Sequence, residues 1–257
     1  MDKQKLIDSL KNGLIVSCQT EPHDIIHEEN RTVVMFAKAA EWGGAVAIRS
    51  NSVEQVRLIR EAVKLPIIGL EKRVYDGFGI ETATDVIITP TVEDAVALYN
   101  AGAEIIAVDC TQRLNPWGKM RYEIIPEIKK AIPDAIILAD VDNTESALIA
   151  EKYGADMVAP TLFGYTKETA NLTPPDYMDV ARMCNACKVP VIMEGHVYTP
   201  EDAMKSIYLG CHAVVVGSAI TRPHLTTKRY VDLLNGLKSD WRDAEKSWTG
   251  DKSELNK

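Results

Sequence analysis

Apolar residues gather along this chain in short continuous runs, and the stretches between them show the periodicity of amphipathic helices. A strand that is buried on both faces, as in a parallel sheet, forms a continuous apolar run because neither face meets water. The pattern predicts eight strands, at 13–18, 45–49, 66–71, 104–109, 135–140, 157–162, 190–194 and 213–217, and a short extra strand at 85–89. Strands that alternate with helices in this way favour an α/β fold.

One helix–strand unit occurs three times and strengthens this prediction. The units begin at Thr91, Asn143 and Thr199 and reach a glycine eleven positions later, at Gly102, Gly154 and Gly210. The first residue can accept hydrogen bonds from the first helical turn, and the glycine can end the helix in a left-handed conformation. Repeated units predict a closed (β/α)8 TIM barrel. The alternative is an open doubly wound sheet, which normally carries G-x-G-x-x-G after its first strand, and this chain lacks that motif.

The length of the chain fits one barrel. Its 257 residues are close to the usual size of this fold, so we predict a single domain over 1–257. Residues 1–12 are expected to form a short capping helix. Its apolar residues Leu6, Ile7 and Leu10 share one helical face, which we expect to plug the bottom of the barrel.

The C-terminal extension, 238–257, is polar but contains Trp241 and Trp248. A solvated tail rarely needs two tryptophans, because each exposes a large apolar surface. We therefore expect this extension to pack on the barrel or on a second subunit, and we predict a homodimer.

Composition limits the classes of function. No apolar run reaches the roughly 18 residues that a membrane span needs. The first residues are charged and lead into no apolar signal region, so a cytoplasmic location is expected. The net charge of −8 argues against a nucleic-acid surface, which needs clustered Lys and Arg. It does not exclude an anionic substrate, because local backbone N–H groups and a single arginine can hold one phosphate.

The cysteines are scattered and odd in number, which is typical of reduced cytosolic thiols. They are Cys18, Cys110, Cys184, Cys187 and Cys211. Cys184 and Cys187 have the C-x-x-C spacing, but they lie late in a predicted helix without a second pair for zinc and without a βαβ redox context. We interpret them as buried or incidental thiols, with a metal or redox role as the weaker alternative.

Polar residues follow seven of the eight predicted strands. In a TIM barrel the chemistry lies at the carboxyl ends of the strands, so these residues are expected to converge on one mouth. The candidates are Gln19, Arg49, Lys72, Asp109, Asp140, Glu194, Gly195, Gly217, Ser218 and Arg222.

The glycines after the seventh and eighth strands suggest a phosphate site. Gly195 and Gly217, with Ser218, let backbone N–H groups approach an anion closely. Arg222 can add a charge-assisted contact. The alternatives are tight-turn glycines and a surface arginine held by Pro223.

Lys72 and Glu194 suggest proton transfer. Lys72 lies beside Arg73 and near Arg49 on the neighbouring strand, and like charge with partial desolvation lowers the pKa of a lysine. Glu194 ends the seventh strand, four strands away from the strand of Lys72, so the two side chains are expected to face each other across the mouth. An amine and a carboxyl on opposite faces of a planar intermediate can invert a stereocentre. The alternative is a salt bridge without chemistry.

Eight segments resemble the N-acylglucosamine-6-phosphate 2-epimerase family, also called N-acetylmannosamine-6-phosphate 2-epimerases. They are GLIVSCQ (13–19), AVAIRS (45–50), PIIGLEK (66–72), ITPT (88–91), LADVDN (138–143), TLFGYT (161–166), VIMEGHVYTPEDA (191–203) and GSAITRP (217–223). They occur in order over most of the chain. The resemblance implies a barrel without metal or organic cofactor that interconverts the 6-phosphates of N-acetylmannosamine and N-acetylglucosamine, usually in bacterial sialic-acid catabolism.

The resemblance also assigns roles to residues. It implies catalytic roles for Lys72 and Glu194, supporting or substrate contacts for Gln19, Arg49, Asp140 and Arg222, and phosphate contacts for Gly195, Gly217 and Ser218. The chain departs from the family pattern at Glu71, Val141, Asp142, Phe163 and His196. Because Lys72 and Glu194 are retained, we expect the departures to affect the preference for the acyl group or sugar.

These inferences give a mechanistic hypothesis. In the ring-opened sugar the C1 aldehyde makes the C2 hydrogen removable. Neutral Lys72 takes that proton, Arg49 stabilises the oxyanion, and protonated Glu194 returns a proton to the other face. A one-base variant in which substrate groups relay protons fits equally well. Two other functions stay open: a class I aldolase with a Schiff base on Lys72, and a sugar-phosphate sensor without catalysis.

Overall fold

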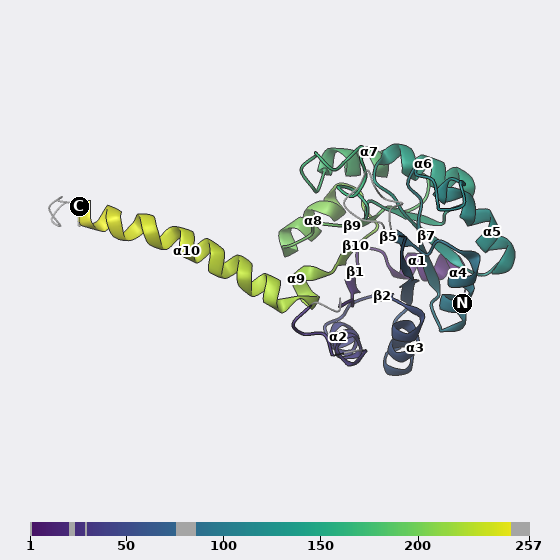
Figure 1. Ribbon diagram of the computed structural model, residues 1–257, viewed down its shortest axis with the longest axis horizontal. Helices are drawn as coiled ribbons and strands as arrows, with labels where there is room; N and C mark the ends of the chain where they lie inside the picture. The colour runs from purple at the N-terminus through teal and green to yellow at the C-terminus, as the bar shows by residue number, and fades with distance from the viewer. Residues whose placement is uncertain (1, 21–23, 29, 76–85, 248–257) are drawn as a thin grey trace.

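The computed structural model describes residues 2–20, 24–28, 30–75 and 86–247, with 236–247 described as helical backbone only. Eight parallel strands curve into a barrel that helices surround (Figure 1). The barrel strands are β1 Leu14–Ser17, β2 Ala47–Asn51, β3 Ile67–Leu70, β6 Ile105–Asp109, β7 Ile136–Asp140, β8 Met157–Ala159, β9 Ile192–Glu194 and β10 Ala213–Val216. Their order is β8-β7-β6-β3-β2-β1-β10-β9, and a parallel bridge between Val158 and Val191 joins the two ends. The predicted (β/α)8 barrel is confirmed.

Helices connect the strands, as the alternating pattern predicts. They are α1 Lys3–Ser9, α2 Arg31–Trp42, α3 Val53–Ala62, α4 Val92–Asn100, α5 Ile124–Ala131, α6 Thr144–Tyr153, α7 Tyr177–Ala186, α8 Pro200–Tyr208, α9 Ser218–Thr221 and α10 Pro223–Ser247, with a 3-10 turn at Arg121–Glu123. In the part of the chain that the structure describes, no helix is both long and apolar enough to cross a membrane.

The three repeated units begin and end as predicted. Thr91, Asn143 and Thr199 each accept a hydrogen bond at their side chain from the backbone N–H three residues later. Gly102, Gly154 and Gly210 all have φ between 102° and 106°, a conformation in which a Cβ is strained. These helix ends turn the chain directly into the next strand.

The extra strand and the sixth strand refine the prediction. β5 Val86–Ile88 lies within the predicted 85–89 and pairs antiparallel with β4 Lys72–Val74, so the two form a hairpin beyond β3. The sixth strand, predicted to reach 162, ends at Ala159. Pro160 follows it and has no backbone N–H with which to continue the ladder.

Alternation along each strand separates two apolar cores. Inward residues such as Ala47, Ile68, Leu138 and Ile192 fill the barrel, and their neighbours pack against the helices. Leu6, Ile7 and Leu10 are buried in the same inner cluster, so α1 contributes to the barrel interior. The inward-facing positions continue along each strand to polar residues at its carboxyl end, and these polar residues define the candidate site.

α10 leaves the barrel and runs outward as one long helix (Figure 1). Its described part exposes a series of apolar side chains, namely Tyr230, Val231, Leu233 and Leu234. The predicted extension, 238–257, begins within this helix. The side chain of Trp241 and all of Trp248 lie outside the described residues.

Candidate functional site

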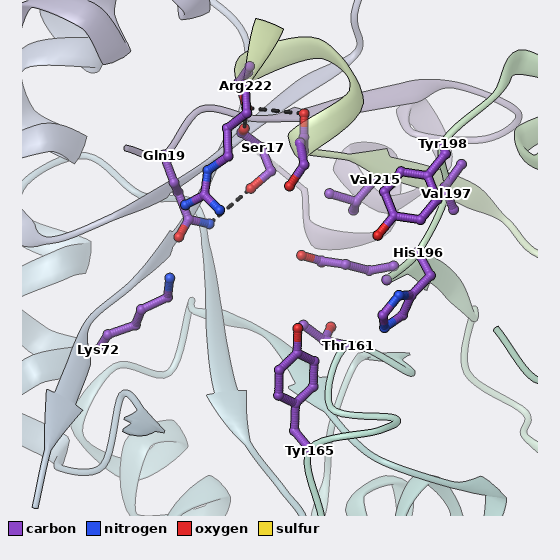
Figure 2. A pocket seen from close by; sticks show the side chains of 15 residues that line it. Ser17, Gln19, Lys72, Thr161, Tyr165, His196, Val197, Tyr198, Val215 and Arg222 are labelled. Carbon is purple, nitrogen blue, oxygen red and sulfur yellow. Dashed lines mark hydrogen bonds between the residues drawn. The ribbon is translucent and has the colours of Figure 1, made fainter. Parts of the chain in front are cut away.

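A cavity of about 250 Å³ opens among the carboxyl ends of β1, β9 and β10 and the first residue of β4 (Figure 2). Seven of the predicted site residues line it: Gln19, Lys72, Glu194, Gly195, Gly217, Ser218 and Arg222. Ser17, Thr161, Tyr165, His196, Val197, Tyr198, Val215 and Thr221 complete the lining. Arg49 and Asp140 do not line it, although the sequence placed them at the substrate.

Successive side chains of a strand point to opposite faces, and this alternation explains which residues reach the site. On β3 the inward residues are Ile68 and Leu70, and the same parity carries on to Lys72 at the start of the hairpin. The Lys72 backbone N–H donates to Asn51 Oδ1 at 2.9 Å, which ties the turn to the end of β2. In Figure 2 the Lys72 side chain enters the cavity from the side opposite His196 and Tyr198.

Arg49 holds two carboxyl groups inside the barrel. Its guanidinium is 1% exposed and donates to both carboxylate oxygens of Asp140, at 3.1 and 2.7 Å. Arg49 Nη1 also lies 2.9 Å from Glu194 Oε2, as an ion pair without the alignment of a hydrogen bond. The hydroxyl of Thr161 donates to Asp140 Oδ1 at 2.6 Å. Arg49 therefore positions Glu194 from behind, and Asp140 fixes Arg49.

Burial gives Glu194 an unusual titration. Loss of solvent, and to a lesser extent the negative charge of Asp140, raises the pKa of Glu194, and the net result is about 7. The positive charges of Arg49 and Lys72 act in the opposite direction. Near neutral pH this carboxyl is therefore present in both protonation states, as a group that accepts and donates protons must be.

The positive cluster that the sequence suggested around Lys72 is largely neutralised. Arg73 Nη2 lies 2.7 Å from Asp94 Oδ1, and Arg49 is engaged by Asp140 and Glu194. The sequence could not show the carboxylates that face both arginines.

Small residues and one arginine form the other part of the cavity. Gly195 has φ of +107°, which only glycine adopts without strain, and a Cβ on Gly217 would lie 3.4 Å from Ser17 Cβ. Gln19 Nε2 donates to Ser17 Oγ at 2.9 Å. Arg222 Nε lies 3.2 Å from Asp24 Oδ2, so a buried carboxylate orients this arginine.

An aromatic wall was not predicted as part of the site. Tyr165, His196 and Tyr198 line the cavity, with centroid separations of 6.5 Å between the first two rings and 6.3 Å between the last two. The guanidinium of Arg229 lies 4.4 Å from the centroid of the Tyr198 ring. All three aromatic residues follow the ends of the sixth and seventh predicted strands, a position that could have identified them.

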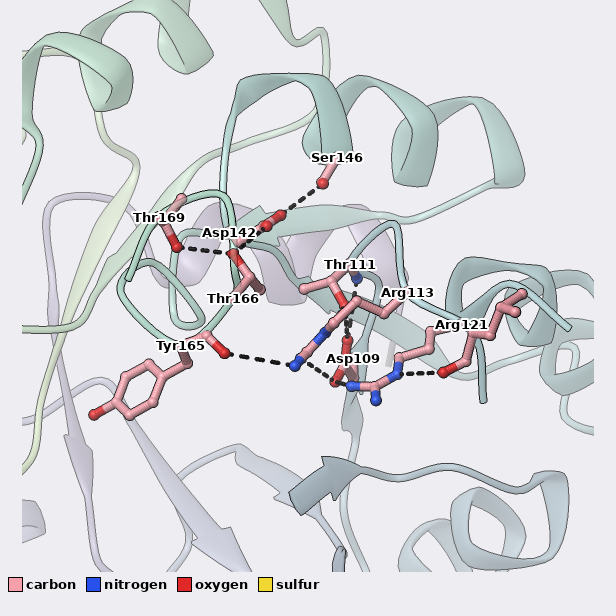
Figure 3. A network of polar contacts seen from close by, with 10 residues as sticks. Asp109, Thr111, Arg113, Arg121, Asp142, Ser146, Tyr165, Thr166 and Thr169 are labelled. Carbon is pink, nitrogen blue, oxygen red and sulfur yellow. Dashed lines mark hydrogen bonds and ion pairs between the residues drawn. The ribbon is translucent and has the colours of Figure 1, made fainter. Parts of the chain in front are cut away.

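Asp109 was a candidate by position, but it does not line the cavity. It accepts hydrogen bonds from Thr111, Arg113 and Arg121, and so anchors the loop after β6 (Figure 3). Arg113 also donates to the backbone carbonyl of Tyr165 at 3.5 Å. The network thus supports the aromatic wall from behind.

Three of the departures from the family pattern are structural. Glu71 accepts a hydrogen bond from the backbone N–H of Val53 at the start of α3, at 3.1 Å. Asp142 accepts hydrogen bonds from the hydroxyls of Ser146 and Thr166. Phe163 is buried. His196, in contrast, lines the cavity at φ of +57°.

Fold and cavity together define a (β/α)8-barrel enzyme scaffold whose mouth holds an amine, a carboxyl and a glycine-lined pocket. A family model described as "NanE: Putative N-acetylmannosamine-6-phosphate epimerase" matches residues 33–236. The chain belongs to this family, and the predicted family resemblance is confirmed.

Individual relatives agree with this assignment. A "Putative N-acetylmannosamine-6-phosphate 2-epimerase" of Caldanaerobacter subterraneus is 42% identical over 89% of this chain and 94% of its own length. The Clostridioides difficile protein of the same name is 40% identical over 88% of this chain and 97% of its own. The solved N-acetylmannosamine-6-phosphate 2-epimerase of Clostridium perfringens superposes with a TM-score of 0.80 at 37% identity, covering 89% of this chain and 96% of that one.

Proposed function

We propose that this protein is an isomerase that interconverts N-acetylmannosamine 6-phosphate and N-acetylglucosamine 6-phosphate. The observation that carries the proposal is that Lys72 and Glu194 line one cavity, and that Glu194 has a pKa near 7. The names of the relatives supply the substrate.

The chemistry follows from the two groups. When the sugar ring opens, the C1 aldehyde acidifies the hydrogen on C2. The neutral amine of Lys72 removes this proton, and the electrons move into an enolate. Protonated Glu194 then delivers a proton to the opposite face, which inverts C2. A relay through substrate groups with one protein base remains a variant of the same proton transfer.

Arg49 has a different role from the one first expected. Its guanidinium is buried behind the cavity lining, where it binds Asp140 and pairs with Glu194, which leaves it poorly placed to bind the oxyanion directly. In this proposal it positions Glu194. The hydroxyl of Ser17 and the amide of Gln19 lie at the cavity surface and are better placed as donors to the open-chain sugar.

The phosphate is assigned to the glycine-lined part of the cavity. Gly195, Gly217 and Ser218 present backbone close to the cavity, and Arg222 adds a fixed positive charge beside it. An anchor at C6 holds C2 in place between the two proton-transfer groups, and such orientation can offset several kcal/mol of a barrier.

Proton NMR in heavy water tests the proposal directly. N-acetylmannosamine 6-phosphate incubated with the enzyme should yield N-acetylglucosamine 6-phosphate, and the C2 proton signal should disappear as solvent deuterium replaces it. Epimerisation that retains the original C2 hydrogen would rule out this chemistry. Binding of the sugar phosphate without turnover would instead favour a sensor.

We also propose that the protein acts in the cytoplasm as a homodimer. The support for the homodimer is apolar surface that is exposed to solvent. α10 runs outward from the barrel and carries Leu233 and Tyr230, which are 67% and 69% exposed, and Trp42 of α2 is 92% exposed. Exposed apolar surface of this kind marks contact sites. Sedimentation should show a dimer, and Leu233→Asp should weaken it while Asp232→Asn should not. A wild-type monomer at micromolar concentration would contradict the proposal.

A further inference from the structure

A second cavity, of about 390 Å³, lies at the opposite end of the barrel. Its lining residues immediately precede the barrel strands β1, β9 and β10 or end the helices before them, so it shares no residue with the site at the mouth. Three cysteines line it: Cys184 and Cys187 near the end of α7, and Cys211 just before β10. The epimerase mechanism uses none of them.

Two of these thiols are in contact. Cys184 Sγ and Cys211 Sγ lie 3.7 Å apart, although 27 positions separate the residues in sequence. The backbone between α8 and β10 approaches closely here, since a Cβ on Gly210 would lie 3.2 Å from Cys184 Cβ. Cys211 is 3% exposed, whereas Cys184 is half-buried at the cavity. The two sulfurs are therefore already in contact, and a disulfide requires them to approach to about 2 Å.

The two thiols differ in chemical character. The contact between the two sulfurs lowers the pKa of Cys184 and raises the pKa of Cys211, which burial raises further. Burial raises the pKa of Cys187 to about 11. Lys11 and Lys188 also line this cavity and favour an anion there. Because Cys184 is the more accessible of the two contacting thiols and Cys211 is buried behind it, Cys184 is suited to attack and Cys211 is suited to resolve.

We propose that Cys184 and Cys211 form an oxidisable dithiol that reacts with small-molecule disulfides entering the cavity. The Cys184 thiolate attacks one sulfur of the disulfide, so that a mixed disulfide forms and one small thiol leaves. Cys211 then loses its proton and attacks Cys184 Sγ, which releases the second small thiol. Two protein thiols are oxidised to one disulfide, and one small disulfide is reduced to two thiols. This assignment replaces the interpretation of the thiols as incidental.

The bond would close a loop that contains β9 and α8. Because a cross-link restricts the unfolded chain, the oxidised protein should unfold at a higher temperature, by on the order of 5 °C. The cavity lies at the far end of the barrel from Glu194, so turnover should change less than twofold.

The test uses the full-length protein with oxidised glutathione as the probe. Intact-mass spectrometry should show loss of two hydrogen atoms, and peptide mapping without reduction should show a Cys184–Cys211 link. Cys184→Ser should abolish the reaction, and Cys211→Ala should trap glutathione on Cys184. Cys187→Ser is the matched control and should react like the wild type.

Three results would overturn the proposal. These are a stable glutathione adduct on the wild-type protein, a link between Cys184 and Cys187, and no loss of thiols under conditions that oxidise a small dithiol. Peptide mapping of the wild type decides between these results even if a variant fails to fold.

Discussion

Replacing Asp140 by Asn should shift the pH profile of the enzyme by a predictable amount. Asp140 and Glu194 bind the same guanidinium, and the negative charge of Asp140 helps to raise the pKa of Glu194 to about 7. Two carboxylates that share one guanidinium lie roughly 5 Å apart, and at an effective dielectric constant of about 20 they repel by about 3 kcal/mol. This energy corresponds to about two pKa units. The variant loses the repulsion, so the pKa of Glu194 should fall from about 7 toward about 5.

The direction of the effect on turnover follows from counting protons. In the proposed mechanism the productive enzyme carries one proton on the Lys72–Glu194 pair, and the acid limb of kcat/KM reports the addition of a second proton. A lower pKa of Glu194 moves this limb to lower pH. It also makes the form with neutral Lys72 and protonated Glu194 rarer, so the plateau should fall by roughly 10- to 100-fold. The loss must be equal in both directions, because the equilibrium constant fixes the ratio of the two kcat/KM values.

The assay is kcat/KM for N-acetylmannosamine 6-phosphate against pH, with the wild type and Asp140→Asn side by side. Asp142→Asn is the matched control, because Asp142 is a buried carboxylate on the same segment that accepts hydrogen bonds from the hydroxyls of Ser146 and Thr166. Near-ultraviolet circular dichroism checks that each variant is folded. An acid limb that stays at the wild-type pH in a folded Asp140→Asn protein would refute the reasoning, because Asp140 would then not control Glu194.

Three further predictions test the site. Lys72→Met should lower kcat by roughly 10³-fold or more with little change in substrate binding. Lys72→Arg should not restore turnover, because a guanidinium does not act as a base at neutral pH. Steady-state kinetics and calorimetric measurement of substrate binding check both variants. Glu194→Gln should become more stable relative to wild type as pH rises. A folded-state pKa raised from 4.5 to about 7 removes stability as pH increases through this window. Denaturant unfolding should show the difference growing by about 3 kcal/mol between pH 4.5 and about 8. Gly195→Ala should raise KM about tenfold, because φ of +107° strains a residue with a Cβ beside the phosphate. Gly44→Ala, with φ of +87° and open space around it, is the control and should leave KM unchanged.

Much of the fold could be predicted because the residues that define it act locally. The caps at Thr91, Asn143 and Thr199 and the apolar runs report on their own helices and strands, and the structure confirms them. Seven of the residues that line the cavity could also be predicted, since the carboxyl ends of parallel strands must meet at one mouth.

What the sequence could not show is which charges meet inside the barrel. Asp109 and Asp140 are partners in register on neighbouring strands and look equivalent. Asp109 is held by Arg113 and Arg121 from its own loop, whereas Asp140 is held by Arg49 from another strand. The contact between Cys184 and Cys211 was hidden for the same reason, because it depends on how two distant segments pack.

The buried charges show how the barrel keeps a carboxyl group ready to exchange a proton. Burying Arg49 with Asp140 costs desolvation energy, and a hydrophobic pair of similar volume is often as stable. What the buried pair provides is electrostatic control of the pKa of a third group, Glu194. If Arg49 were present without Asp140, its positive charge would keep Glu194 ionised. If Arg49 were absent, Glu194 would stay protonated, because burial raises its pKa. With both present, the charges of Arg49 and Asp140 act in opposite directions, desolvation is the largest effect, and the pKa of Glu194 is about 7. In the proposed mechanism a carboxyl group with such a pKa can deliver the C2 proton in one direction and remove it in the other, so the stability lost at high pH accompanies reversible turnover.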